Sequence, residues 1–343
     1  YLDALDVIAT VENDDDILFN SNVLSFGDVQ VDDSSVMTIS GIVNDDVDLG
    51  NHEFNLMILA EYIDLNDNMF EYQKSYSFTI DLSLNQAGFP FDTNSEIKSS
   101  PLVIDFTNDG NNEIIFGDNV GLIHTLSSDG IPLDNDIFPY DTGNQIWGSP
   151  ASGYIDSDDL IDIVVTSKSK HLYVLDKDGL KLDYYANKYL VGTPALVNLD
   201  DDEDLEIVFG SFSSNANLYA VNIDGSDVEG FPLPLEKAQK GPALADFNDN
   251  GKDDIVIGTE SDEIYLIFDD GSIADGFPFV TDDKIRSAPS ILDTGNEKII
   301  LSGSEDGNFY GINSDGTLRF VIQCGEEIHT SPSFLETDTG LMI

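Results

Sequence analysis

The chain of 343 residues contains few basic residues. Lys and Arg together number 14 against 66 Asp and Glu, and only Arg286 and Arg319 are arginines. The formal net charge of −52 disfavours nucleic acid and anionic membranes as partners, because both bind positively charged surfaces. Such a surface is tolerable where salt screens it and cations bind to it, so we expect an ion-rich setting.

Cysteine and long apolar runs are scarce too. The single cysteine, Cys324, excludes an internal disulfide bond. No run reaches the roughly 18 apolar residues that a membrane-spanning helix needs, so we expect no membrane insertion. The chain begins at Tyr1 with neither Met nor a signal peptide, and we therefore expect it to be a piece of a longer protein.

The first 87 residues carry β-branched and aromatic side chains in alternation with polar ones. This period of two recurs in residues 5–11, 36–40, 54–63 and 76–82, and clusters of Asp and Asn separate the runs. Short strands at such spacing, divided by turn residues, predict an antiparallel sandwich of about seven strands. No arrangement of residues in this segment indicates catalysis.

An internal repeat begins at residue 88. A small residue followed by Pro opens each unit, and each opening leads into an apolar strand, an Asp-rich loop and a second apolar strand. A third strand then ends in an Asp-Gly turn, and a looser fourth segment follows. Four strands in 43 to 49 residues predict the blades of a β-propeller, so the whole chain is expected to be all-β. The opening prolines are Pro101, Pro150, Pro194, Pro242, Pro289 and Pro332.

Residues 88–343 resemble the FG-GAP (VCBS-type) repeats, which form the blades of integrin α-subunit propellers and of many secreted bacterial proteins. The shared features are Ser-Ser-Pro openings, as at Pro101, and Gly-Phe-Pro tails, as at residues 276–278. The resemblance implies a β-propeller of about six four-stranded blades. Residues 1–87 resemble the Ig-like β-sandwiches that follow the catalytic domains of secreted gingipain-like or subtilisin-like peptidases.

The most complete acidic loop lies between two apolar strands of the fourth unit. Its side-chain oxygens are spaced as in the calcium-loop signature D-x-[DN]-x-[DN]-G, in which alternate side chains of a tight turn point inward. No Glu stands at position twelve and no helix flanks the loop, so it is not an EF-hand. Residues 255–258 follow instead as a buried strand. The predicted ligands are Asp246, Asn248, Asn250, the carbonyl of Lys252, and Asp254.

The same spacing recurs in the first three units, with substitutions. The second loop departs most, because Tyr154 stands at position one and Asp159 replaces the glycine. The fifth and sixth loops, at 293–296 and 336–340, are shortened, and we expect no metal there. We predict two to four structural Ca²⁺ ions, although a solvated acidic turn is the alternative for each loop. The further predicted ligands are Asp105, Thr107, Asp109, Asn111, Glu113, Asp156, Asp158, Asp162, Asn198, Asp200, Asp202, Asp204 and Glu206.

No catalytic motif surrounds His124, His171 or His329, so we expect no enzyme activity from this chain. A propeller polysaccharide lyase is the enzymatic alternative, but such enzymes need basic residues to hold uronate carboxylates. Two readings stay open. The chain is either an extracellular scaffold or adhesion segment that binds a protein or glycan, or the non-catalytic C-terminal part of a secreted peptidase. Both place it outside the cell, secreted or on a bacterial surface, with other domains of the parent protein as further partners.

The two ends of the repeat region predict how the ring closes. Residues 88–91 match the tail of a blade, whereas the last unit stops after its second strand. Pairing the ends would bury strand edges that otherwise invite aggregation. We therefore expect five complete blades and a sixth shared between residues 88–98 and 329–343, with its missing strand beyond Ile343.

Overall fold

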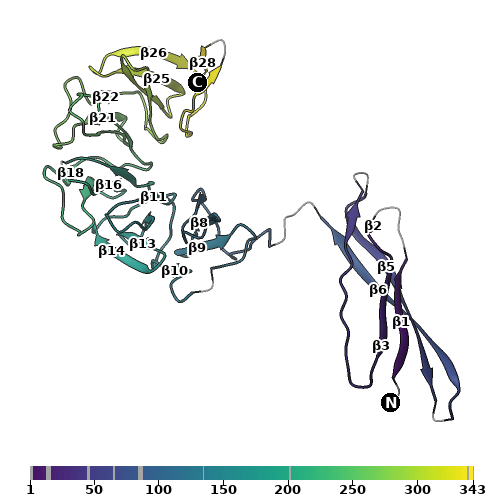
Figure 1. Ribbon diagram of the computed structural model, residues 1–343. Coiled ribbons are helices and arrows are strands. Elements are labelled where there is room, and N and C mark those ends of the chain that lie inside the picture. The colour runs from purple at the N-terminus through teal and green to yellow at the C-terminus, as the bar shows by residue number, and fades with distance from the viewer. Residues whose placement is uncertain are drawn as a thin grey trace. The chain divides into compact units, whose positions relative to one another are not determined.

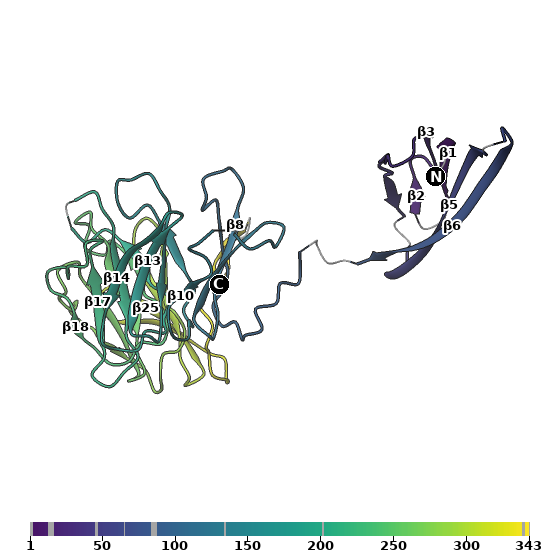
Figure 2. The same cartoon turned by 90° about the horizontal axis from the view of Figure 1, so that it is seen from below.

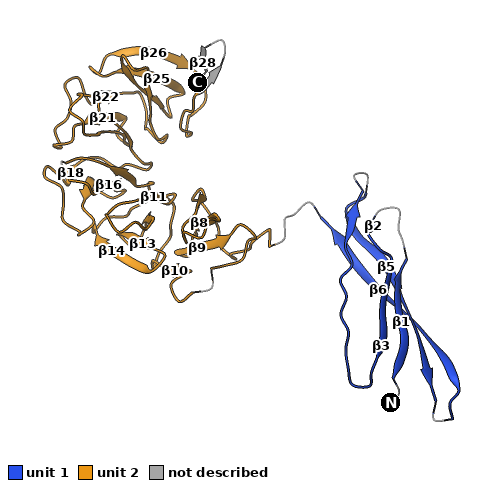
Figure 3. Ribbon diagram, in the orientation of Figure 1, with its two compact units in different colours: residues 1–87 blue, residues 88–343 orange. Residues whose placement is uncertain are grey.

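A computed structural model describes residues 3–12, 17–44, 47–64, 66–83, 88–133, 135–200, 202–337 and 340–342. The chain divides into two compact units, residues 1–87 and 88–343 (Figure 3). All regular elements within these described ranges are strands, and no helix there is long and apolar enough to cross a membrane. The prediction of an all-β protein is confirmed.

The first unit contains a four-stranded antiparallel sheet and a two-stranded one. The order of the larger sheet is β3-β1-β5-β6, and β2 pairs with β4. Val11, Ile17 and Phe54 are buried between the two sheets, so the alternating apolar residues do form the core. The strands are β1 (Ala4–Val11), β2 (Ile17–Phe19), β3 (Val23–Val29), β4 (Gly41–Val43), β5 (Gly50–Ile63) and β6 (Met69–Leu82).

One predicted strand of the first unit is absent. Residues 36–40 alternate in period two, yet they form no strand, and the described part of the unit has six strands instead of about seven. Val36 is 90% exposed, because no neighbouring strand pairs with this segment. An alternating pattern specifies a strand only where a partner covers one of its faces.

The second unit contains five four-stranded antiparallel sheets and a final two-stranded sheet. Figure 1 shows the sheets following one another around an arc in chain order. Each four-stranded sheet uses four consecutive strands, so the predicted propeller blades are confirmed as a fold. The strands are β7 (Leu102–Ile104), β8 (Glu113–Gly117), β9 (Leu122–Ser127), β10 (Tyr140–Asp141), β11 (Ala151–Gly153), β12 (Asp162–Thr166), β13 (His171–Asp176), β14 (Gly179–Tyr185), β15 (Ala195–Val197), β16 (Glu206–Gly210), β17 (Asn217–Val221), β18 (Leu233–Pro234), β19 (Ala243–Ala245), β20 (Asp254–Gly258), β21 (Glu263–Ile267), β22 (Phe279–Val280), β23 (Ser290–Asp293), β24 (Lys298–Gly303), β25 (Asn308–Asn313), β26 (Leu318–Gln323), β27 (Leu335–Thr337) and β28 (Gly340–Met342).

Apolar side chains fill the space between neighbouring sheets. Val164 and Val174 of the second sheet pack in one cluster with Ile207 and Phe209 of the third. Phe209 stacks on Tyr219 at 5.0 Å between ring centroids. The second and third strands of each blade are covered on both faces, which explains why their sequences are continuous apolar runs.

Glycines at two blade openings allow a close approach between neighbouring blades. A Cβ atom on Gly148 would lie 2.5 Å from the carbonyl oxygen of Gly192. A Cβ atom on Gly241 would lie 2.4 Å from the carbonyl oxygen of Thr193. Larger residues would therefore push neighbouring blades apart where the first strands begin.

The outer strand takes two forms. In the first, third and fourth blades it is the two-residue strand β10, β18 or β22, which follows a cis Phe-Pro bond. In the second and fifth blades the outer strands β14 and β26 are longer and continue directly from the Asp-Gly turn. The fourth segment of the repeat is thus an outer strand in every four-stranded blade.

The start of the second unit packs as the tail of a blade. Gly88 lies against the backbone of Asp129 in the first blade, as Gly230 lies against Asp270 of the fourth. At the other end, β27 pairs only with β28 among the described strands. The composite sixth blade therefore stays a prediction.

Candidate metal loops and the opposite end of the propeller

The acidic loops connect the first and second strands of each blade and lie at one end of the sheets. Figure 2 shows strands of successive blades side by side, with connecting loops at both ends. Neighbouring acidic loops touch through their backbones. Leu205 N donates to Ile155 O at 2.9 Å, and Asp253 N donates to Asn198 O at 3.0 Å. The second, third and fourth loops are thus joined in an acidic rim.

The fourth loop turns its predicted ligands inward. Both carboxylate oxygens of Asp246 accept backbone hydrogen bonds, from Asn250 N at 3.1 Å and Gly251 N at 2.8 Å. Gly251 has a φ of 90°, which glycine adopts without strain. Asn248 Oδ1 accepts from Asn250 N at 3.0 Å, and the carboxylate of Asp254 closes the loop as its buried last position.

A carboxylate outside the predicted spacing also joins the fourth loop. Asp269, which follows β21, accepts a hydrogen bond from Asn250 Nδ2 at 2.9 Å, and its backbone N donates to Asp254 Oδ1 at 3.2 Å. Burial raises the pKa of Asp254 to about 6. The only signal for Asp269 in the sequence is its place just beyond the third strand, which loop spacing does not include.

The first loop repeats this geometry. Asp105 accepts from Asp109 N and Gly110 N, each at 3.0 Å. Glu113, 4% exposed, accepts from Thr107 N at 2.9 Å. The Oγ1 atom of Thr107 is buried without a hydrogen-bond partner, so an oxygen at position three is left available. Such an atom fits a cation ligand, because a buried polar atom without a partner is costly.

Two predicted positions stabilise the turns through their nitrogen atoms. Asn111 donates its backbone N–H and its side-chain amide to Asp109 Oδ1, at 2.8 and 3.1 Å. Lys252 N donates to Asn250 Oδ1 at 2.8 Å. These hydrogen bonds orient the acidic and amide side chains of the loops.

The third loop gathers three carboxylates. One oxygen from each of Asp200, Asp202 and Glu206 lies within 4.8 Å of the other two. Burial, and next the charges of the two aspartates, raise the pKa of Glu206 to about 7, although its hydrogen bond from a backbone N–H acts against this. Asp204 N donates to Asp202 Oδ1 at 2.9 Å, and Asn198 contributes the carbonyl that contacts the next loop. A divalent cation would relieve the repulsion among these groups.

The second loop surrounds a protein cation. The Nζ atom of Lys181 lies 2.6 Å from Asp156 Oδ2, 2.9 Å from Asp158 Oδ2 and 3.1 Å from Asp162 Oδ1. The structure thus brings together the three predicted ligands but places an ammonium group where we predicted calcium. The loop spacing could not reveal this, because Lys181 comes from β14.

Replacing Asp246 by Ala is expected to lower stability in calcium by about 1 to 2 kcal/mol, because Asp246 orders two backbone N–H groups and supplies a cation ligand. Asp293→Ala is the matched control in the shortened fifth loop and should cost clearly less. Chemical denaturation in calcium measures both variants. Equal losses would contradict the distinction between complete and shortened loops.

The opposite end of the blades repeats as regularly. In each four-stranded blade, the residue two positions beyond the second strand donates its backbone N–H to the carbonyl of the residue six positions before the first strand. Because the first two strands are antiparallel, this contact lies at the end opposite the acidic loop. The hydrogen bonds, 2.7 to 2.9 Å long, join Asn119 to Glu96, Lys168 to Gln145, Phe212 to Tyr189, Glu260 to Lys237, and Glu305 to Lys284.

Basic and aromatic side chains gather at this end. The Nζ atoms of Lys98 and Lys168 lie 4.3 and 4.0 Å from the ring of Trp147, and Lys237 Nζ lies 5.6 Å from the ring of Phe212. We call these five residues the lysine–aromatic arc. Eight of the 14 basic residues in the chain lie at this end of the blades. They are Lys98, Lys168, Lys170, Lys188, Lys237, Lys240, Lys284 and Arg286.

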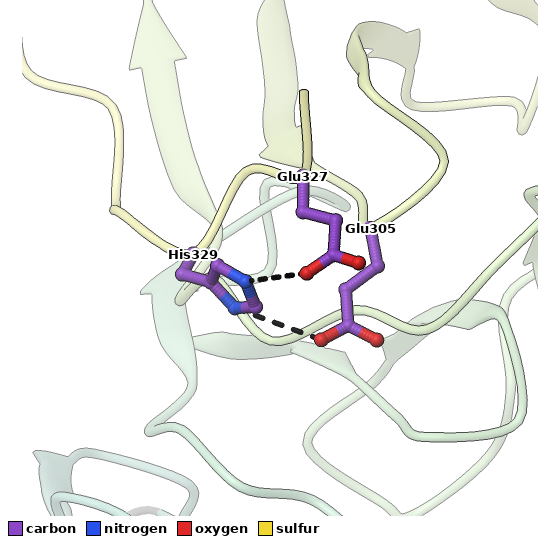
Figure 4. A group of neighbouring side chains, drawn as sticks. All are labelled: Glu305, Glu327 and His329. Atoms are coloured by element: carbon purple, nitrogen blue, oxygen red, sulfur yellow. Dashed lines mark hydrogen bonds and ion pairs between the residues drawn. The ribbon is translucent and has the colours of Figure 1, made fainter. Parts of the chain in front are cut away.

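An ion-pair network continues this end into the fifth blade (Figure 4). His329 lies between two glutamates, with Nε2 3.1 Å from Glu327 Oε2 and Nδ1 3.7 Å from Glu305 Oε1. Arg286 also reaches Glu305 Oε1 at 2.8 Å, and Lys284 Nζ lies 3.8 Å from Glu305 Oε2. Protein cations therefore already compensate the charge of Glu305.

Comparison with known proteins places the fold. No protein-family model matches the chain, and no curated protein matches its sequence. The structure is similar to that of BBS1N in complex with ARL6DN, with a TM-score of 0.52 and 12% identity over 68% of this chain and 70% of that one. It is also similar to the V. cholerae biofilm matrix protein Bap1, with a TM-score of 0.51 and 19% identity over 69% of this chain and 41% of that one. BamB from Moraxella catarrhalis gives a TM-score of 0.50 with 14% identity, over 84% of this chain and 75% of that one. Residues 88–343 form a β-propeller.

Proposed function

We propose that the chain is a non-catalytic, calcium-stabilised binding segment of a secreted or cell-surface bacterial protein. In this proposal an FG-GAP or VCBS-type propeller follows an Ig-like sandwich, and calcium closes the first, third and fourth acidic loops. In the third loop one oxygen from each of Asp200, Asp202 and Glu206 lies within 4.8 Å of the other two, and in the first loop Thr107 Oγ1 is available. Extracellular calcium modules of weak affinity use ligands of this kind.

The observation that carries the binding role is the lysine–aromatic arc. A chain with a net charge of −52 gathers cations and its only Trp at the end of the blades opposite the acidic rim. Aromatic and basic side chains at one surface are typical of binding sites for partners with acidic groups. The proposed partner is a protein with an acidic segment. BBS1N, which shares the propeller fold, was crystallised with the protein ARL6DN.

The absence of catalysis is part of the proposal. The ring nitrogens of the propeller histidines contact carboxylates, as in the pairs of His124 with Asp118 and His171 with Asp183. Such a pair does not by itself make a hydrolase, which also needs a nucleophile beside the other ring nitrogen. Neither a peptide nor a polyuronate is expected to be turned over.

Binding to the arc is tested with a labelled deca-glutamate peptide, followed by fluorescence anisotropy in calcium buffer. The double charge reversal Lys168→Glu and Lys237→Glu should weaken binding at least tenfold, and added salt should weaken it as well. Lys74→Glu, in the first unit, is the matched control and should change affinity less than twofold.

Two results would overturn the binding proposal. One is peptide binding that the double variant leaves unchanged, and the other is no binding by the wild-type protein. Binding of alginate without binding of the peptide would replace the protein partner by an acidic glycan. Turnover of either substrate, abolished by a point mutation in this chain, would contradict the non-catalytic role.

A further inference from the structure

The two blades with a long outer strand direct a basic side chain at the acidic loop of the same blade. In the second blade Lys181 reaches its three loop aspartates from β14. In the fifth blade Arg319 of β26 reaches Glu297 with two hydrogen bonds, NH2 to Oε1 at 2.7 Å and NH1 to Oε2 at 2.9 Å. Two blades thus share one arrangement.

Lys181 owes its direction to an irregularity in strand pairing. Val174 pairs with Leu182 and Leu175 pairs with Leu180, so Lys181 is an extra residue without a partner across the ladder. A bulge of this kind bends the strand and redirects the side chain of the extra residue. The redirected side chain is 15% exposed and ends among the loop carboxylates.

Arg319 stands at the same irregularity in the fifth blade. Gly311 pairs with Phe320 and Ile312 pairs with Leu318, which leaves Arg319 as the extra residue. The shared bulge shows that the two basic residues are structurally equivalent. This equivalence follows from strand pairing alone and does not depend on the sequences of the acidic loops.

The other three blades carry an apolar residue at this position. There the outer segment touches the third strand through a single bridge, made by Leu126 and Pro132, Val221 and Asp227, or Ile267 and Ile273. The next residue then donates its backbone N–H to the third strand. These residues are Leu133, Val228 and Ala274. The blades in question are those for which calcium is proposed.

The electrostatics of the second loop match a substituted cation. Asp162 is fully buried, and Asp156 and Asp158 stand at two other positions of the same turn. The ammonium group of Lys181 lies 2.6 to 3.1 Å from a carboxylate oxygen of each of the three.

We propose that the residue at the bulge position decides which cation closes each acidic loop, and that Lys181 takes the place of calcium in the second blade. The second loop then closes without metal and becomes a calcium site once Lys181 is replaced. This inference rests on the calcium binding proposed above for the other loops. Three carboxylates without Lys181 give the charge and oxygen ligands that a calcium loop needs.

The test is Lys181→Leu, which introduces the residue of the first blade. Isothermal titration with calcium chloride should show one more ion bound per chain than in the wild-type protein. In chelator the variant should melt at a lower temperature than the wild-type protein. Excess calcium should raise the melting temperature of the variant and so remove this difference. Arg319→Leu is the matched control, and it should gain no ion because the shortened fifth loop has too few carboxylates.

The outcomes separate this inference from the proposed function. If the wild-type protein binds no calcium, the proposal that the other acidic loops bind calcium is wrong. One ion gained by Lys181→Leu would still support the proposal that Lys181 takes the place of calcium in the second loop. An unchanged number of ions, or a variant as stable as the wild-type protein in chelator, would overturn it. Lys181→Gln is made in parallel. If neither variant folds in excess calcium, the inference is also wrong, because calcium should then replace the ammonium group.

Discussion

Removal of calcium by a chelator should lower the melting temperature of the propeller by roughly 10 °C. With free calcium about tenfold above Kd, each of the three loops contributes about 1.4 kcal/mol, and about 1 kcal/mol shifts a domain of this size by roughly 2 to 4 °C. The physical cause is repulsion among the loop carboxylates, which calcium neutralises. Calorimetry with chelator, and with calcium restored, measures the shift.

The first unit serves as the internal control for this experiment. Residues 1–87 lack the phased acidic loops, so their transition should stay within about 2 °C. Magnesium at equal ionic strength should restore little, because it requires octahedral geometry and keeps its water ligands. A melting temperature of the propeller that the chelator leaves unchanged would contradict calcium binding by the acidic loops.

In chelator, replacing Glu206 by Gln should increase the free energy of unfolding at pH 8 by on the order of 3 kcal/mol. Burial, and then Asp200 and Asp202, raise the pKa of Glu206 from 4.5 to about 7. A raised pKa stabilises the protonated folded state. This contribution is fully present below about pH 4.5 and is lost as pH rises through about 7. Metal-free wild-type protein should therefore lose stability across that window, and the Gln variant should not.

Urea denaturation at several pH values from 5 to 8 measures this difference. Glu203→Gln is the matched control, since Glu203 lies exposed in the same loop and should leave the pH dependence unchanged. In excess calcium the order should reverse at pH 8, because the Gln variant lacks a carboxylate ligand. Parallel pH curves for Glu206→Gln and the wild-type protein would contradict the prediction.

Much of the fold could be read from local patterns. The opening prolines and runs such as residues 255–258 predicted the blades, because strands covered on both faces need continuous apolar residues. Residues 36–40 show the limit of such patterns. Their alternation predicts a strand, but strand formation also needs a neighbour, and none of the described strands pairs with them.

The acidic loops show the same difference between local patterns and long-range contacts. Asp105 and Asp246 order the turns around them, because the backbone groups they bind lie within five residues of them. Local spacing therefore sufficed to locate these turns, whereas calcium binding by their side chains stays a prediction.

Only the tertiary structure decided which cation the second loop holds and where the basic residues gather. Lys181 reaches that loop because a bulge redirects it from another strand, and no spacing within the loop encodes that register. Lys98, Trp147 and Lys168 belong to different segments and meet only where blades pack together. A sequence determines directly what neighbouring residues do on one turn, whereas contacts between strands depend on register and on the packing of whole sheets.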